Sequence, residues 1–384
     1  MTNQSYDWRS NFLFKEVDNS TLIVFRIIFG GLLFYHVVSS LSEGTMYENF
    51  IQPPFTFNFI GFDFLQPLPG NGMYFYFALM AILALMIMLG AWYRLSMAAF
   101  TIMWLCIYLM QKAGYNNHYY LVLLICSLMA FMPAANYCSI DVKRKAAGKK
   151  LSCSRWVILI FISQVAIVYF FAATSKLYAD WSSGKFIAIQ FSRLSTHHLV
   201  GILYSQKWFQ LLICYGGFFF DLLIVPLLLW KKTRNYAFIL SCLFHLFNSY
   251  TFRIGIFPYL SIALNLFFLK PEKIRSFFFK NKPSFVPAHN NIHTSTKRKL
   301  ITYGLAVYLL IQVLLPLRPL FYPGNVFWTE EGYRMSWKMM LRTKSGSIYF
   351  KVVDPVSKKI WKIQPSKIFA PSQVMWLAIS PDVI

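Results

Sequence analysis

Nine long apolar stretches recur along this chain, and seven of them contain no Asp, Glu, Lys or Arg. A helix that crosses a bilayer needs about 20 mostly apolar residues, so these stretches predict membrane-spanning helices. The predicted spans are residues 21–41, 73–89, 96–110, 119–132, 157–175, 209–230, 236–252, 254–269 and 301–317. The two spans on either side of Arg253 could instead form one broken helix.

The composition supports the same fold class. Hydrophobic residues make up 57% of the 384 residues, and charged residues only 13%, against about 25% in a typical soluble domain. A soluble fold of this length could not cover so much apolar surface with so few polar groups. The composition therefore excludes an ordinary cytosolic enzyme, a disordered tail and a secreted disulfide scaffold. It predicts an all-α polytopic membrane bundle with about nine transmembrane helices.

The net charge of +23 does not indicate a nucleic-acid-binding protein, because the basic residues lie in short clusters between apolar stretches. With a cytoplasmic N-terminus, the inside loops would hold 20 Lys and Arg residues and the short outside loops five. This bias follows the positive-inside rule and predicts a cytoplasmic N-terminus. Nine spans then place the C-terminus outside the cytoplasm, whereas one span more or fewer would reverse its side.

The sequence predicts three regions. Residues 1–20 form a polar lead, 21–317 the transmembrane domain, and 318–384 a small β-rich extramembrane domain. In the last region, residues 348–353 and 360–363 flank the turn dipeptide Asp354-Pro355 and predict a β-hairpin. The sequence stops in an apolar segment, which leaves open an incomplete domain. The first apolar stretch is not expected to be a cleaved signal peptide, and the six cysteines imply no disulfide or metal site.

Ionisable side chains at membrane depth are costly and are therefore functional candidates. Each also has a structural interpretation. Arg26 and Asp221 could be ion-pair partners between helices, His36 could face the lipid headgroups, and Asp180 could belong to a helix end beside an aromatic belt. The full set is Arg26, His36, His118, Lys176, Asp180, Asp221, His245 and Arg253.

Lys176 follows a long uncharged run, which allows two interpretations. Spacing alone slightly favours an interfacial lysine that extends its amine towards water. The alternative is a poorly solvated amine that can accept a proton near neutral pH. His118 stands at the start of a span and His245 in the middle of one, and lone membrane histidines are more often helix–helix hydrogen-bond partners. A polar cluster of the three is plausible, but it does not identify a reaction.

Four segments in a fixed order resemble motifs of the vitamin K-dependent γ-glutamyl carboxylases and their bacterial HTTM (horizontally transferred transmembrane) relatives. They are 116–121 (NNHYYL), 171–181 (FAATSKLYADW), 216–222 (GGFFFDL) and 244–249 (FHLFNS). The similarity also includes Phe25-Arg26 and 88–94, and it extends over about residues 20–270. A weaker similarity continues at Gly332-Tyr333 and at 336–340 (SWKMM).

This resemblance implies a carbon–carbon lyase that carboxylates glutamyl side chains. The family uses reduced vitamin K or a menaquinol-type hydroquinone with O2 and CO2 as co-substrates, and it converts the quinol to an epoxide. The implied partners are a glutamyl peptide or protein and the lipid bilayer, and the implied location is a bacterial inner membrane. A water-poor site would protect the reactive carbanion from protonation. Nucleic acid and metal are not expected.

The resemblance also assigns roles to residues. Lys176 would be the base that acts on the hydroquinone, and His118 and Asn117 would contact the quinone oxygens or hold the reacting geometry. His245 would line the same pocket, as a third catalytic candidate with Lys176 and His118. Tyr333 and Trp337 would border the opening for a glutamyl peptide. The candidates for support of the cofactor site are Asn116, Arg26, Asp180 and Asp221.

Two departures from the animal enzymes matter. Those enzymes carry two adjacent lysines where this chain has Ser175-Lys176, and they have a much larger lumenal part than the residues that follow the last span here. Propeptide-type docking is therefore doubtful. Two other interpretations remain open: a transporter or lipid- or quinone-binding protein on the same scaffold, and a menaquinol-using redox enzyme without carboxylation.

Overall fold

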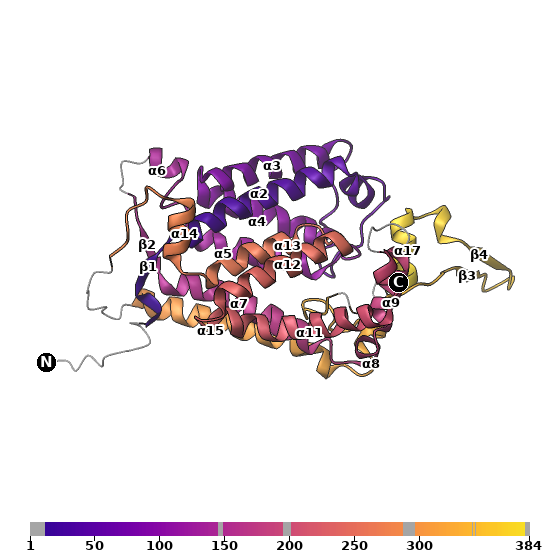
Figure 1. Ribbon diagram of the computed structural model, residues 1–384. Coiled ribbons are helices and arrows are strands. Elements are labelled where there is room, and N and C mark those ends of the chain that lie inside the picture. Colours follow the sequence, from indigo (N-terminus) through magenta and orange to yellow (C-terminus); the bar gives the residue numbers. More distant parts are fainter. Residues whose placement is uncertain are drawn as a thin grey trace.

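The computed structural model describes residues 12–144, 149–194, 201–286, 296–339, 341 and 343–380, so most of the predicted N-terminal lead lies outside the described residues. Long helices form a bundle, as the sequence predicted (Figure 1). The bundle consists of α2 (Ser20–Ser42), α3 (Gly72–Leu89), α4 (Tyr93–Met110), α5 (Asn117–Phe131), α7 (Arg155–Thr174), α11 (Lys207–Leu229), α12 (Arg234–Phe252), α13 (Phe257–Asn265) and α15 (Thr296–Leu317).

Each predicted span corresponds to one of these helices, but the expected number of about nine membrane crossings is not confirmed. Among the described residues, six helices are long and apolar enough to cross a membrane: α2, α3, α4, α7, α11, and α15 together with η3 (Arg318–Phe321). Helix α5 is too short, and so is α13 with η2 (Leu266–Phe268). Helix α12 has 19 residues but carries several polar side chains, among them Ser241 and His245. The chain turns sharply between α12 and α13 at Arg253, which has a φ of 49°.

Two helices meet at unusually close range in the bundle. A side-chain Cβ at Gly30 of α2 would lie 2.5 Å from the backbone nitrogen of Met88 in α3. Only a glycine lets two backbones approach this closely. In the last long helical segment, by contrast, only 11% of the apolar window is buried inside the protein, so most of its apolar side chains lie on the outer surface of the bundle.

The short elements gather at two opposite ends of the bundle (Figure 1). One end carries the N-terminal side of the described chain, with β1 (Glu16–Asp18) paired to β2 (Ser152–Ser154), and with α6 (Ile140–Arg144) and α14 (Pro271–Phe278). The other end carries α8 (Ala179–Ser182), α9 (Lys185–Leu194), α17 (Pro371–Ile379) and the hairpin of β3 (Phe350–Val353) and β4 (Ile360–Ile363). The remaining short elements are η1 (Tyr47–Ile51), α10 (Gly201–Tyr204), α16 (Val326–Thr329) and η4 (Pro365–Lys367).

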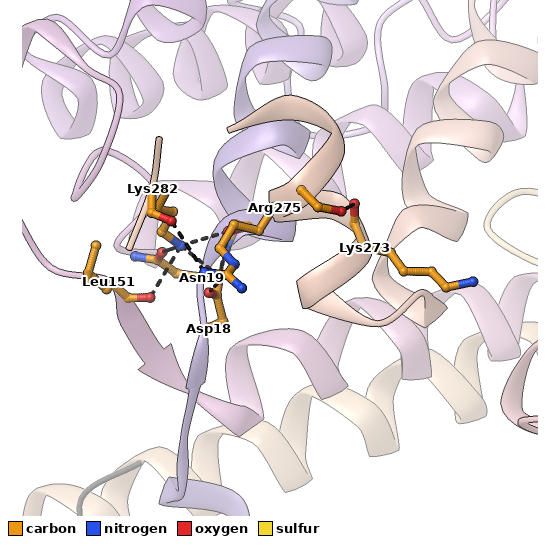
Figure 2. A network of polar contacts seen from close by, with 8 residues as sticks. Asp18, Asn19, Leu151, Lys273, Arg275 and Lys282 are labelled. Carbon is orange, nitrogen blue, oxygen red and sulfur yellow. Dashed lines mark hydrogen bonds and ion pairs between the residues drawn. The ribbon is translucent and has the colours of Figure 1, made fainter. Parts of the chain in front are cut away.

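A buried lysine holds the first of these ends together (Figure 2). The Lys282 amine has no exposed surface, and it donates hydrogen bonds of 2.7 Å to Asp18 Oδ1, Asn19 Oδ1 and Ser20 Oγ. Burial lowers the pKa of Lys282, and the Asp18 carboxylate opposes this shift. The segment after α14 is thereby fixed to the start of α2.

The C-terminal region contains the predicted hairpin, with Val353 opposite Ile360. It also contains α17, which a purely β-rich expectation did not include. The Gln373 side chain in α17 donates a 2.7 Å hydrogen bond to the Phe55 carbonyl. The C-terminal region therefore packs against the loop between α2 and α3. All six cysteines are free, in agreement with the absence of a predicted disulfide.

Candidate functional site

A cavity of about 380 Å³ lies among the helices, near the end of the bundle that carries α8 and α9. Its walls come from α5, α7, α11, α12 and α13, and the segment 330–341 closes one side. Most of the wall is apolar, and a few polar side chains converge on it. Such a composition is typical of small-molecule sites. The apolar wall includes Val165, Val168, Phe244, Phe252, Phe257 and Leu264.

Lys176 lies in this wall, just after the end of α7, and its amine forms an ion pair with Asp221 of α11. The two side chains are 10% and 9% exposed. The same amine lies 3.3 Å from the Ala172 carbonyl and 5.3 Å from the centre of the Trp181 ring. The approach to Lys176 is apolar, as its sequence suggested, but the nearest polar group is a carboxylate.

His245 enters the cavity from the middle of α12 and is 2% exposed. Its Nε2 lies 2.7 Å from the Tyr169 hydroxyl, and its Nδ1 is buried without a hydrogen-bond partner. The Asn265 amide extends the contact, because it donates to Ser241 Oγ at 2.7 Å and to the Tyr169 hydroxyl at 3.4 Å. One ring nitrogen of His245 is therefore held in place, and the other is buried without a hydrogen-bond partner among the described residues.

The start of α5 contributes His118 and the two asparagines. Asn116 accepts a 2.9 Å hydrogen bond from the Tyr119 amide and so caps the helix. Asn117 accepts from the Tyr115 hydroxyl at 2.9 Å and donates to the Lys338 carbonyl at 3.1 Å. The His118 ring lies 5.5 Å from the Phe257 ring, and the His245 ring lies 6.3 Å from it. The two histidines therefore flank one aromatic side chain of the cavity wall.

The segment 330–341 covers the cavity through Tyr333 and Lys338, among others. The Tyr333 hydroxyl donates to the Lys338 carbonyl at 2.8 Å, so this carbonyl receives two hydrogen bonds. Trp337 has a φ of 57°, an unusual conformation for a bulky residue, and its side chain is completely buried against Tyr120. It anchors the segment but does not line the cavity.

Three of the predicted site residues lie away from the cavity wall. Trp337 is one of them. Arg26 is fully buried where α2 meets the turn at Gly90, and it donates to the Cys138 carbonyl at 2.6 Å. Asp180 lies in the first turn of α8 with 64% of its side chain exposed, and it pairs with Lys185 at 3.7 Å. The structure brings together Lys176, His118, His245, Asn116, Asn117, Asp221 and Tyr333.

Sequence reasoning missed several polar groups at or beside the site. Asn265 and Ser241 interrupt apolar stretches and could have been noticed for that reason. Nothing in the sequence distinguishes Tyr169 from the other aromatic residues, because the chain contains 23 Tyr and 39 Phe residues. Lys338 lies in a loop after the last span, where charged residues are common and do not by themselves indicate a functional site.

The fold and the cavity define a class: a multi-pass helical membrane protein with a mostly apolar cavity that is lined in part by the segment after α15. Comparison with known families matches residues 14–272 to the HTTM domain. Residues 297–384 match the lumenal domain of vitamin K-dependent gamma-carboxylase. The chain belongs to the HTTM family and is a vitamin K-dependent carboxylase-like membrane protein. No solved structure matches it.

Proposed function

We propose that this protein is a quinol-dependent γ-glutamyl carboxylase that couples epoxidation of a vitamin K-type hydroquinone to addition of CO2 to glutamate. One observation carries the proposal. Lys176, His118 and His245 come from three separate parts of the sequence, and they line one mostly apolar cavity. That cavity lies beneath a segment that belongs to the match with the carboxylase lumenal domain.

The cavity residues fit a hydroquinone. A flat ring with two hydroxyl groups and an apolar tail needs aromatic walls and a few hydrogen-bond partners. The cavity volume of about 380 Å³ falls within the range of small-molecule sites, and Trp181, Phe244 and Phe257 supply aromatic surface. The unpartnered Nδ1 of His245 is a buried polar atom, and a quinol hydroxyl would satisfy it.

In this proposal Asp221 holds the shared proton when quinol is bound, and the neutral Lys176 amine accepts the proton of a quinol hydroxyl. The ammonium that forms then pairs with the deprotonated quinol oxygen. An ammonium beside a carboxylate and an amine beside a carboxylic acid have the same net charge and differ only in the position of one proton. The pair can therefore present a neutral amine to the quinol if Asp221 holds that proton. When bound, reduced vitamin K supplies, with O2, the base that takes the glutamate γ-proton.

The other residues position the reactants and exclude water. The Tyr169 hydroxyl fixes the ring of His245 through Nε2, and Nδ1 has no hydrogen-bond partner in the described part of the chain. The rings of His118 and His245 both lie near the Phe257 ring, at 5.5 and 6.3 Å. Residues of the segment 330–339, among them Tyr333 and Lys338, line one side of the cavity, where they would reduce the access of water that protonates a carbanion. Tyr333 lies where a glutamyl peptide would enter from the extramembrane side.

The test uses the purified full-length protein with reduced vitamin K, labelled CO2 and a short Glu-containing peptide. Label in the peptide together with quinone epoxide supports the proposal. Epoxide without label indicates an epoxidase, and neither product in a folded protein that binds quinol indicates a binding or transport role. Lys176→Ala should reduce epoxide formation far more than quinol binding. Equal loss of both would make Lys176 a binding residue.

We also propose the membrane arrangement and the division of the chain. Residues 21–317 form the membrane domain in a bacterial inner membrane, and 318–384 an extracytoplasmic unit that can receive the glutamyl substrate. The β1–β2 end, where the basic loops around α6 and α14 gather, then faces the cytoplasm (Figure 1). The C-terminal hairpin lies at the opposite end of the bundle, in keeping with this orientation.

A further inference from the structure

The wall of the main cavity carries more positive than negative charge. Its described charged residues are four basic and two acidic ones: Lys112, Lys176, Arg334, Lys338, Asp221 and Glu330. Each carboxylate already pairs with an amine, Asp221 with Lys176 and Glu330 with Lys344. A mostly apolar cavity with surplus positive charge favours an anionic ligand over a neutral one.

Lys338 contributes a charge for which the described chain supplies no counter-ion. Among the described residues, neither a hydrogen bond nor an ion pair reaches its amine, and its neighbour is the Phe327 ring, whose centre lies 5.6 Å away. The residue is half-buried, and burial lowers the pKa of the amine. The fold thus holds a partly desolvated amine without a carboxylate, an arrangement that a bound carboxylate would relieve.

A ligand can reach this amine. Some polar side-chain atoms of the described chain are both enclosed and without a partner, such as Tyr108 Oη and His245 Nδ1, but Lys338 Nζ is not one of them. Because Lys338 Nζ also forms no hydrogen bond, it must retain accessible surface. The residue itself belongs to the wall of the cavity.

The backbone at Lys338 is fixed independently of its amine. Its carbonyl accepts hydrogen bonds from Asn117 Nδ2 at 3.1 Å and from the Tyr333 hydroxyl at 2.8 Å. The preceding residue, Trp337, is completely buried. The amine therefore extends from a position that is already ordered, which lowers the entropy cost of binding a ligand. Its removal leaves these backbone contacts in place.

We propose that the Lys338 ammonium binds the side-chain carboxylate of the glutamyl substrate. The inference rests on the proposed function, because that carboxylate is the anion that the reaction brings into the cavity. Lys338 lies in the match with the carboxylase lumenal domain, on the same segment as Tyr333, where the peptide would enter. Lys176 comes from the helical domain and already pairs with Asp221. The two amines thus serve different substrates, Lys176 the quinol and Lys338 the peptide.

The binding test compares two short peptides with blocked termini that differ only by Glu or Gln at one position. Microscale thermophoresis of the full-length protein in lipid nanodiscs should show tighter binding of the Glu peptide. Lys338→Met should weaken binding of the Glu peptide by about 10- to 100-fold, the scale of one charge-assisted hydrogen bond, and leave the Gln peptide unaffected. Lys367→Met is the control, because Lys367 is exposed in the same C-terminal region and lies outside the cavity wall.

Thermal unfolding separates a binding role from a structural one. Lys338→Met removes no hydrogen bond or ion pair that the described chain makes with the amine, so its melting temperature should change little. Lys338→Arg keeps the charge and should keep most of the preference for Glu. A large fall in the melting temperature of Lys338→Met, with equal loss of both peptides, would make Lys338 a structural residue and overturn the proposal.

Kinetics supply a second readout. In the carboxylation assay, Lys338→Met should raise KM for the Glu peptide by the same factor and leave KM for quinol unchanged. A loss of quinol affinity with peptide binding unchanged would assign the amine to the quinol and overturn the proposal. No measurable binding of the Glu peptide, equal binding of both peptides to the wild type, or a preference for Glu that survives in Lys338→Met would do the same.

The outcomes also distinguish this inference from the proposed function. A preference for Glu that depends on Lys338, without label in the peptide, would retain the carboxylate site and refute the carboxylase function. Label in the peptide with an unchanged KM in Lys338→Met would retain the carboxylase function and refute the role of Lys338.

Discussion

At the residue scale, the charge state of the main cavity depends on the contact between Lys176 and Asp221. Both side chains are about nine-tenths buried, so neither can rely on water to stabilise its charge. The pair therefore has a structural role as well as the proposed chemical one. The two roles can be separated, because stability requires only compatible partners whereas proton transfer requires the amine itself.

Asp221→Asn should lower the free energy of unfolding by about 3–5 kcal/mol, because it leaves a buried ammonium without its counter-charge. The measurement is thermal or denaturant unfolding in detergent. The double variant Lys176→Met with Asp221→Leu should recover most of this loss and should form no epoxide. If the double variant is as unstable as the single one, the two residues do not stabilise each other.

The sequence indicated which ionisable residues were unusual, but it could not indicate their partners. Lys176 and Asp221 are 45 positions apart, and His245 and Tyr169 are 76 positions apart. Contacts of this kind depend on how helices rotate and pack, which an apolar stretch does not encode. Arg26 and Asp180 illustrate the reverse case: both stood out in the sequence, and the structure places both away from the cavity.

At the scale of elements, helix positions were largely predictable, because each apolar stretch folds locally into a helix. The number of membrane crossings was less predictable, since α5, α12 and α13 are shorter or more polar than a free-standing span requires. Such helices are supported by neighbours within the bundle. Helix α5 packs against α4, and α13 packs against α12, α2 and α7.

Gly30→Ala should destabilise the bundle by about 1–3 kcal/mol, as is typical of overpacking. Its new Cβ would lie 2.5–2.6 Å from backbone atoms of Met88, and a backbone cannot move aside as a side chain can. Gly31→Ala is the matched control, because its Cβ meets only Met88 Sδ at 3.6 Å. Thermal unfolding of both variants in detergent measures the difference, and equal melting temperatures would show that the helices separate without cost.

Lys282→Met should lower the free energy of unfolding by about 3–5 kcal/mol, because it leaves the buried Asp18 carboxylate and its neighbours without their shared donor. Lys273→Met is the control from the same region. Its amine points away from the cluster (Figure 2), and it contacts Asn235 at 3.2 Å on the exposed surface. This control should change stability by no more than about 0.5 kcal/mol. Similar losses in both variants would contradict the assigned role of Lys282.

At the scale of the whole molecule, the two ends of the bundle differ in kind. The elements β1, β2, α6 and α14 lie at one end, and α8, α9, α17 and the C-terminal hairpin lie at the other (Figure 1). The Lys282 cluster joins the start of α2 to the segment after α14 at the first end, and residues of α8 and α9 line the cavity near the second. The proposed orientation directs the second end away from the cytoplasm. It predicts which surface cysteines a membrane-impermeant reagent can reach.

Cys138 is exposed and lies just before α6, so an impermeant maleimide should label it only after the cells are permeabilised. A cysteine at the hairpin tip, Val356→Cys, replaces a residue that is 89% exposed and should be labelled in intact spheroplasts. Cys138→Ser gives the background from the other thiols. Labelling of Cys138 in intact spheroplasts would reverse the orientation.

The chamber wall includes residues that follow α15, among them Tyr333, Trp376 and Ser380. During synthesis, every apolar helix can therefore enter the bilayer while the residues that close the chamber are still inside the ribosome. The wall of the cavity is therefore complete only after the residues that follow α15 have been synthesised and have packed against the helices.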